Sequence, residues 1–176
     1  MLGRAFAMDP AFSHIFPDPG ERARRLPLLF DLFLRIDEAD GFVTTGGDGA
    51  AAALWRPPGR AHPSPWRMIA HAIELRRIFG RRLFRALALD DAVRRHHPAT
   101  PLWYLHVLGC DPDAQRRGAG RAAVEAGLAR IASDGLPCFL ETATETNIAF
   151  YRKLGFEVVE EWALPDGPRL WGMMRG

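Results

Sequence analysis

Along residues 102–131 the spacing of the hydrophobic positions changes from that of a strand to that of a helix. The run 103–108 is bulky at nearly every position, which is typical of a strand covered on both faces. The segment 111–113, Asp-Pro-Asp, ends this strand, because proline offers no ladder donor and aspartate favours turns. The pattern therefore predicts a central strand, a polar turn and a helix. Simple alternation puts three strand side chains on a common face: Trp103, Leu105 and Val107. After Gly118, helical spacing puts three others on one face of the helix: Val124, Leu128 and Ile131.

The first hundred residues predict helices around a hairpin. A helix is expected over 21–40, kinked or delayed by Pro27. Segments 41–45 and 50–55 form a hairpin candidate across a glycine-rich turn. Proline-rich residues then lead into helices that run to about His97. Trp66, Ile69 and Ile73 share one helix face. The aromatic residues Trp66, Phe79 and Phe84 either stack on the ring of a bound molecule or, as is commoner at helical spacing, lie in the core.

The last third of the chain predicts the rest of a sheet. Residues 138–142 form a strand parallel to the central one, because strand, helix and strand in this length give a right-handed crossover. A short helix follows within 144–154, and segments 156–164 and 169–174 read as an antiparallel pair. The predicted fold class is α/β (α+β), with a mixed central β-sheet and flanking helices. The length of 176 residues, 48% of them hydrophobic, predicts a single domain over residues 1–176.

The turn before the second helix has the composition of an anion site. At a helix N-terminus several N–H groups lack intrahelical partners and the helix dipole is positive. Gly118 and Gly120 remove side chains that would obstruct a phosphate. Positive charge and hydrogen-bond donors surround the two glycines: Gln115, Arg116, Arg117 and Arg121. A diphosphate fits this description.

Other interpretations of the glycines are weaker. Residues 118–123 match a dinucleotide fingerprint, and Glu141 lies near the spacing of a ribose-binding acid, but that fingerprint needs its first glycine at the end of the strand. Here the connector 111–117 intervenes. A phosphate-binding loop of the nucleotide hydrolases needs Gly-Lys-Ser/Thr, which the sequence lacks. A glycine-rich helix start without a ligand leaves the neighbouring Gln-Arg-Arg run unexplained.

Two ordered motifs carry a family resemblance. Residues 115–120, Gln-Arg-Arg-Gly-Ala-Gly, match the Q/R-x-x-G-x-G/A motif of the GNAT superfamily of N-acetyltransferases, preceded by a strand that ends in 108–112. Residues 147–156, Asn-Ile-Ala-Phe-Tyr-Arg-Lys-Leu-Gly-Phe, resemble the N-x-x-F/Y-Y-x-x-x-G-F signature of the same family. The resemblance is weak before Pro98 and strong after it. It implies the GNAT fold and a transfer of an acetyl group from acetyl-CoA.

Within that superfamily, three further segments resemble the puromycin N-acetyltransferase-like subgroup. They are 97–105, 140–142 and the closing run 165–175. The start departs from the family, which normally opens with a strand and a helix. The first strand is expected to be absent or truncated, and a sheet edge to be exposed.

The resemblance also implies roles for individual residues. The backbone of Leu108, Gly109 and Cys110 would bond the pantetheine arm where the central strand splays from its neighbour. Tyr151 would face the sulfur as general acid, and Asn147, one helical turn earlier, would bond the cofactor or cap its helix. The diphosphate would lie on the loop residues Gln115, Arg116, Arg117, Gly118, Ala119, Gly120 and Arg121.

The base that accepts the amine proton has two candidates. Glu141 ends a strand beside the reactive centre, and His106 lies in the central strand with a suitable intrinsic pKa. We favour Glu141. Cys110 suggests an acyl-cysteine route, but nothing in the sequence supplies an activating base, so direct transfer in a ternary complex is expected. Acidic residues 37, 38 and 40 either attract a cationic amine or form a solvated helix end.

Composition excludes several other classes of protein. The formal charge is only +2, so nucleic-acid binding has little electrostatic support, and the arginine pairs are expected on solvated helix faces. Cys110 and Cys138 make no metal spacing and fit free thiols in a reducing compartment, so no metal is expected. No signal peptide or membrane-spanning run is evident, which predicts a cytoplasmic protein.

The function expected from the sequence is N-acetylation with acetyl-CoA as co-substrate. The acceptor is a primary amine of a small molecule or a peptide N-terminus, without a nucleic-acid or membrane partner and with a homodimer left open. The alternative is a module that binds acyl-CoA without turnover.

Overall fold

One mixed sheet of six strands runs through the computed structural model, which describes residues 1–64 and 66–176. The strands lie in the order β1-β2-β3-β4-β6-β5. Only β3 and β4 pair in parallel; the other neighbours are antiparallel. The bounds are β1 Phe42–Gly46, β2 Ala51–Arg56, β3 Trp103–Cys110, β4 Cys138–Thr142, β5 Glu157–Ala163 and β6 Arg169–Arg175. The predicted hairpin, the parallel crossover and the closing antiparallel pair are confirmed.

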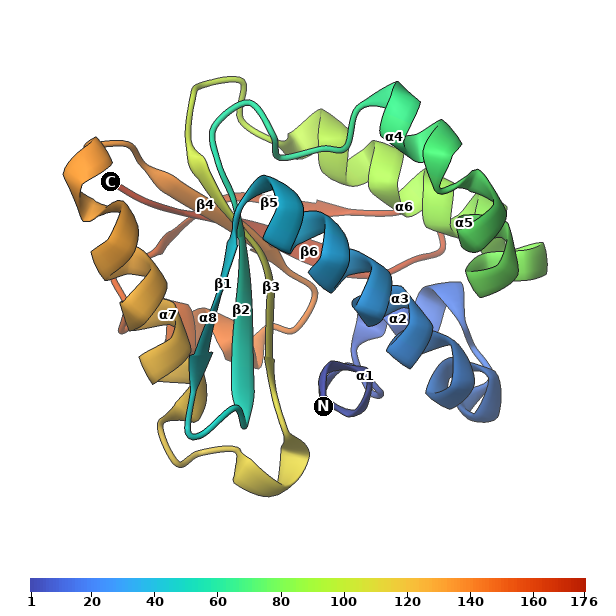
Figure 1. The fold of residues 1–176 in the computed structure, drawn as a ribbon, viewed down its shortest axis with the longest axis horizontal. Coiled ribbons are helices and arrows are strands. Elements are labelled where there is room, and N and C mark those ends of the chain that lie inside the picture. The colour runs from blue at the N-terminus through green and yellow to red at the C-terminus, as the bar shows by residue number, and fades with distance from the viewer.

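Helices cover both faces of this sheet (Figure 1). On one face lies α7, which contacts β1, β2 and β3; α3 and α1 contact the sheet on the other face. The bounds are α1 Leu2–Ala5, α2 Pro10–Ile15, α3 Pro19–Asp40, α4 Pro65–Ala70, α5 Ala72–Phe79, α6 Leu83–His96, α7 Ala119–Ile131 and α8 Thr146–Arg152, with single 3₁₀ turns η1 Gly80–Arg82, η2 Pro112–Ala114 and η3 Ala132–Asp134. The predicted fold class, a mixed sheet with flanking helices, is confirmed.

The chain enters the sheet through helices. Residues 1–41 form α1, α2 and α3 and contribute no strand, so the first strand of the described residues is β1, at the sheet edge. Asp18 caps α3 by accepting a hydrogen bond from the Glu21 N–H, and Asp9 caps α2 in the same way. Pro27 lies inside α3, which nevertheless continues to Asp40.

Strands β3 and β4 diverge soon after they meet. Their register contains only two pairs, Trp103 with Cys138 and Tyr104 with Phe139. Beyond Tyr104, β3 continues for six more residues, paired on its other side with β2. The β4-facing edge of β3 is thus free of strand partners along this length, which leaves backbone groups for another partner.

A β-bulge in β3 changes which side chains face which helices. Leu54 pairs with Val107, but the next residue, Trp55, pairs with Leu105, so His106 is the extra residue. Val107 therefore packs with the α3-side cluster, whereas Leu105 packs with the α7-side cluster. The prediction that these two share one face was wrong, because simple alternation cannot anticipate an inserted residue.

Two glycines, Gly127 in α7 and Gly46 in β1, allow α7 to pack closely against the sheet. A Cβ on Gly127 would lie 2.2 Å from the buried Trp55 ring, and a Cβ on Gly46 would lie 2.2 Å from the Ala119 carbonyl oxygen. Ordinary carbon contacts are longer than 3.4 Å, so both positions need glycine. This close approach places the N-terminus of α7 at the end of the hairpin and next to the end of β3.

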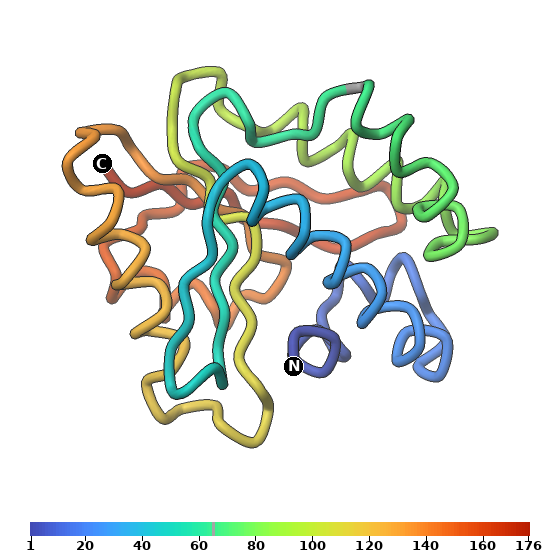
Figure 2. Tube along the Cα trace, in the orientation of Figure 1, coloured from blue at the N-terminus to red at the C-terminus, as the bar shows by residue number. Residues whose placement is uncertain are grey.

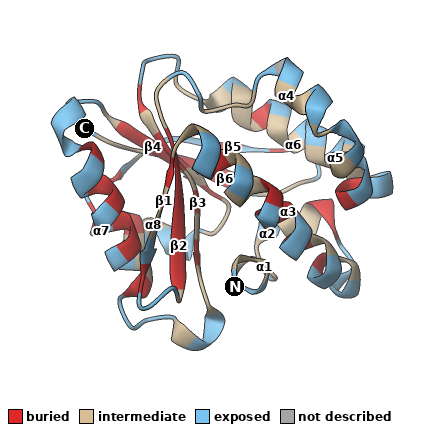
Figure 3. Cartoon of the chain, viewed as in Figure 1, coloured by how far each residue is buried: buried red, intermediate tan, exposed pale blue. Residues whose placement is uncertain are grey.

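The helices between β2 and β3 expose more apolar surface than expected (Figure 3). Trp66 is 80% exposed and Phe84 83% exposed, and Ile69 and Ile73 are also exposed. The core interpretation of Trp66 and Phe84 was therefore wrong, since their helices pack on the molecule through another face. Phe79, from the same set, is buried against Phe16.

Candidate acetyl-transfer site

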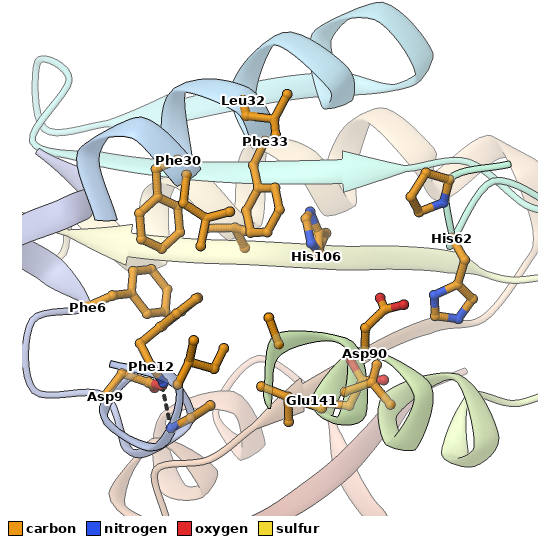
Figure 4. Close-up of a pocket in the computed structure, with 18 of the residues that line it drawn as sticks. Phe6, Asp9, Phe12, Phe30, Leu32, Phe33, His62, Asp90, His106 and Glu141 are labelled. Carbon is orange, nitrogen blue, oxygen red and sulfur yellow. Dashed lines mark hydrogen bonds between the residues drawn. The ribbon is translucent and has the colours of Figure 1, made fainter. Parts of the chain in front are cut away.

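A cavity of about 290 Å³ opens between the sheet and the helices of the α3 side. In Figure 4, Phe30 and Phe33 of α3 reach in from one side and Asp90 of α6 and Glu141 of β4 from the other, with His106 between them. The lining is mostly apolar with few polar groups, as is usual for small-molecule sites. Its floor is the part of β3 that has left β4.

The predicted site residues fall into two groups around β3. Leu108, Glu141, Asn147 and Tyr151 all line the cavity. The loop 115–121 lies outside it, at the tip that joins β3 to α7 (Figure 2). Helix α1 packs closely on Gly109: a Cβ there would lie 2.5 Å from a methyl carbon of Leu2, so the leucine side chain would have to move.

The loop before α7 has open space around its glycines. Gly118 adopts φ 86° as the residue preceding α7 and supplies no side-chain cap to the free N–H groups of the first turn. A Cβ on Gly118 would meet nothing within 4 Å, and one on Gly120 would meet only the Phe150 ring at 4.0 Å. Arg116 and Arg117 are exposed beside them. Arg121 is exposed as well and forms a 2.8 Å ion pair with Glu125. This geometry suits a bound diphosphate, whose oxygens accept from backbone and guanidinium N–H groups.

Tyr151 joins the core cluster and the cavity. Its ring packs edge-on against Phe150 and Phe156, 5.1 and 5.9 Å away. Burial, with a smaller effect of the Asp9 charge, raises the pKa of Tyr151 above its ordinary value. The phenol is therefore protonated at neutral pH and can serve as a proton donor.

Asn147 is not a helix cap. The residue preceding α8 is Glu145, and Asn147 is the second residue of the helix. Its side-chain N–H donates to the Thr142 hydroxyl at 3.4 Å, and the residue is exposed at the cavity edge. The capping alternative is thus wrong, and a cofactor contact stays a prediction.

A buried ion-pair network supports His106. Both Asp37 and Arg56 are buried; the Arg56 Nε–H donates to one Asp37 oxygen at 2.6 Å, and the other Asp37 oxygen lies 2.6 Å from His106 Nδ1. Burial and then the Arg56 charge lower the pKa of His106, so its imidazole is neutral near pH 7. Asp37 stays ionised in spite of its burial, with its pKa below the ordinary value, because both neighbours bond to it.

The sequence did not reveal this network. Arg56 lies 19 positions and His106 69 positions after Asp37 in the chain. In the sequence Asp37 stands out only as one of a run of acidic residues. Those neighbours behave differently: Glu38 is exposed, while Asp40 pairs with Arg60 and Arg67. A solvated acidic helix end therefore describes Glu38 and not Asp37.

Glu141 lines the cavity and has one buried oxygen without a hydrogen-bond partner among the described residues. Its side chain is 6% exposed, and its Oε1 has no hydrogen-bond partner among the described residues. His97 Nδ1, likewise buried and unpartnered, lies 3.8 Å from that oxygen. Burial, followed by the Glu141 charge, raises the pKa of Tyr104 well above its ordinary value.

His62 makes the stability depend on pH. Burial, then the charges of His97 and Arg94, lower the pKa of His62 to about 4. Because the unfolded chain protonates near the ordinary value of 6.5, it binds the proton first, and stability is lost as the pH falls from 6.5 to 4. We expect the H62F variant to reduce this loss by about 1–2 kcal/mol, allowing for solvent screening. Urea unfolding at pH 7 and pH 4.5 measures the difference, and equal losses in both proteins would contradict the assignment.

Cys110 is not activated as a nucleophile. Burial and then the Asp111 charge raise the pKa of its thiol. The second thiol, Cys138, is buried in the core, and burial raises its pKa to about 12. No group of three metal-binding side chains occurs within the described part of the chain.

The segment from the start of α5 to the residues just after α8 matches a known protein family. Residues 72–156 match the Acetyltransferase (GNAT) family. Two curated relatives are mycothiol acetyltransferases. The one from Saccharomonospora viridis is 42% identical over 74 residues, and the one from Propionibacterium freudenreichii is 36% identical over 62 residues. The matches cover 36% and 34% of this chain and only 24% and 20% of those relatives.

Solved structures extend the likeness to the whole chain. A crystal structure described as histone acetyltransferase HPA2 and related acetyltransferase, from Corynebacterium glutamicum, has a TM-score of 0.70 and 26% identity, covering 99% of this chain and 86% of that one. The polyamine N-acetyltransferase of Drosophila melanogaster shares the fold, with a TM-score of 0.53, 16% identity and coverage of 98% and 90%.

Among the described residues, no helix has both the length and the apolar character needed to cross a membrane. Residues 72–156 match the acetyltransferase (GNAT) family, and the solved acetyltransferases resemble the fold over nearly the whole chain, so both findings agree that this chain is similar to acetyltransferases.

Proposed function

We propose that this chain is a single-domain N-acetyltransferase that moves an acetyl group from acetyl-CoA to a primary amine of a small molecule. The observation that carries the proposal is the divergence of β3 from β4, which leaves a free backbone edge between the cavity and the N-terminus of α7. One ligand that places a diphosphate at α7 and a thioester at the cavity floor would use both ends. The family match supports acetyl transfer.

The residues available to hold acetyl-CoA follow the course of β3. Free N–H groups of α7 and the side chains of Gln115, Arg116 and Arg117 would bind the diphosphate, with Arg121 shared with Glu125. The backbone at 108–110 would bond the pantetheine arm, and Asn147 would bond its other edge. Acetyl-CoA would supply the acetyl group as a thioester.

Two side chains would move the protons. Glu141 accepts a proton from the amine nitrogen. The nitrogen forms the new bond to the acetyl carbon, and the carbon–sulfur bond breaks. Tyr151 gives its hydroxyl proton to the departing sulfur. A backbone N–H at the free edge of β3 stabilises the charge that develops on the carbonyl oxygen. No cysteine intermediate is needed, in agreement with the raised pKa of the Cys110 thiol.

His106 is the competing base. Asp37 orients its ring much as the aspartate of a catalytic triad orients histidine, and its imidazole is neutral near pH 7. We favour Glu141 because its Oε1 is unpartnered, whereas His106 already has a carboxylate partner.

Release of free coenzyme A tests the proposed reaction. The chain is incubated with acetyl-CoA and a panel of amines, thiol release is followed, and products are analysed for the mass of one acetyl group. Turnover with at least one small primary amine is expected. Binding of acetyl-CoA without turnover across the panel would favour the acyl-CoA sensor, and failure to bind coenzyme A would overturn both. Turnover of peptide N-termini alone would shift the acceptor class.

Gly120 offers a clean test of the diphosphate site. We expect the G120L variant to weaken acetyl-CoA binding at least about tenfold, because its side chain would occupy the space beside the free N–H groups. Its stability should not fall, since the position is nearly empty and leucine favours helix by roughly 0.5–1 kcal/mol over glycine. Gly118 is less suitable, because its φ of 86° would strain any other residue.

Calorimetric titration with acetyl-CoA and urea unfolding measure these two effects. The control is A126L, at an exposed position two turns into the same helix. Equal acetyl-CoA affinity in G120L and the original protein would exclude this loop as the diphosphate site.

The puromycin N-acetyltransferase-like subgroup stays a proposal that rests on the sequence segments alone. A cytoplasmic location and the absence of nucleic-acid partners are likewise predictions from the sequence. A homodimer also stays open.

A further inference from the structure

The cavity contains one carboxylate with a buried oxygen that no group among the described residues bonds. Asp37 is bonded to Arg56 and His106, Asp90 to Arg94, and Asp9 to the first N–H groups of α2. Glu141 differs, because its Oε1 is buried without a hydrogen-bond partner among the described residues. A buried, incompletely bonded carboxylate costs several kcal/mol in a protein, so this oxygen is prepared for a cation or a strong donor.

A second buried, unpartnered atom lies next to this oxygen. His97 Nδ1 is 3.8 Å from Glu141 Oε1, too far for a direct hydrogen bond, and His97 stands behind Glu141 rather than among the residues that line the cavity. The His97 side chain is only 10% exposed. His62 packs edge-on against His97 with ring centroids 4.9 Å apart, and its Nε2 is also buried and unpartnered. In the suitable tautomer each ring offers an acceptor.

The cationic side chains of the cavity are already engaged. Arg56 donates to Asp37 and to the Ala61 carbonyl, and Arg67 pairs with Asp40. Neither guanidinium is therefore available to an anionic group on a ligand without breaking an existing pair. The other carboxylates of the cavity are bonded too, so a second ammonium would find no free counter-charge among the described residues.

The remaining wall is aromatic. The rings of Phe6, Phe12, Phe30 and Phe33 form a continuous cluster with centroid separations between 4.8 and 5.9 Å. Phe33 continues it to His106, 4.8 Å away. All four rings line the cavity, and in Figure 4 Phe30 and Phe33 lie opposite Glu141 while Phe6 and Phe12 close one end. A volume of about 290 Å³ holds roughly ten water-sized groups, enough for one aromatic ring and a short chain.

We propose that Glu141, His97 and His62 form an ammonium subsite, and that the acceptor is a monoamine with a compact aromatic body. The ammonium binds Glu141 where it lines the cavity, with His62 beside it and His97 behind it, and the body packs against the phenylalanines. This inference rests on the proposed acetyl transfer and narrows its acceptor. Diamines and amino acids are disfavoured because they bring a second charge that the cavity does not compensate.

Binding without acetyl-CoA tests the subsite separately from turnover. The full chain is titrated calorimetrically at pH 8 with 2-phenylethylamine, its neutral analogue 2-phenylethanol, phenylalanine and 1,4-diaminobutane. We expect 2-phenylethylamine to bind at least about tenfold more tightly than each of the others. The E141Q variant should lose roughly thirtyfold in affinity for the amine, and H97F should also lose affinity, while 2-phenylethanol binds both variants as it binds the original protein.

Asp91 provides the matched control. It follows the cavity residue Asp90 but is exposed and pairs with Arg95, so D91N should leave every affinity unchanged. Equal binding of the amine and the alcohol, tighter binding of the diamine, or an unchanged amine affinity in E141Q would each overturn the subsite. If 2-phenylethylamine binds as expected but no coenzyme A is released, the subsite stands and the acetyl transfer fails. If only diamines or amino acids are acetylated, the transfer stands and the subsite falls.

Discussion

The D37A variant is expected to lose about 3–5 kcal/mol in its free energy of unfolding, because it leaves the buried Arg56 without its counter-charge. The Arg56 side chain is only 7% exposed and retains a single other bond, to the Ala61 carbonyl. His106 loses its partner at the same time. A loss of this size is a large fraction of the stability of an ordinary domain. Urea unfolding, followed by the fluorescence of the five tryptophans, measures it.

A neighbouring carboxylate provides the control for this change. Glu38 is exposed at the next position of α3, so E38A should change the free energy of unfolding by less than about 0.5 kcal/mol. A double variant, D37L with R56M, removes both charges and should recover much of the loss, since apolar residues often replace a buried ion pair without penalty. Equal stabilities of D37A and E38A would mean that the network does not support the fold.

The E141Q variant is expected to reduce kcat/KM by about 10²–10⁴, which is the usual contribution of a general base. Its stability should be unchanged or higher, because the substitution removes a buried charge whose Oε1 has no partner. A drop in activity without a drop in stability therefore isolates the chemistry. Initial rates of coenzyme A release, with the best amine of the panel, measure it alongside urea unfolding.

The competing base is tested under the same conditions. H106N removes the imidazole and should reduce kcat/KM far less than E141Q if Glu141 is the base. The control E157Q changes an exposed carboxylate of β5 and should leave the rate unchanged. The reverse order, with a rate loss in H106N that exceeds the loss in E141Q, would transfer the role of base to His106 and its Asp37 partner.

Periodic elements were predictable because their signals are local. The sequence predicted the strand 138–142 at its observed bounds, and the change of spacing near Gly118 predicted α7 within one residue. Gly118, Gly120 and the arginines beside them all lie within residues 115–121, so an anion-binding role could be proposed without knowing where this segment lies in the fold. The core placement predicted for Trp66 in α4 was wrong. Helical spacing shows that side chains share a face but not whether that face is covered.

The cavity belongs to the tertiary structure alone. Asp37, Arg56 and His106 meet only because α3 packs on the face of the sheet that contains β2 and β3. His97 meets Glu141 only because the chain returns beside β4. The inserted residue in β3 follows from pairing with β2, which no periodic pattern encodes. The sequence by itself determined the periodic elements and the composition of the loop before α7, since each depends on neighbouring residues. Only the tertiary structure decided which carboxylates are compensated and which one is free, because a charge is paired or left unpaired by residues far away in the chain.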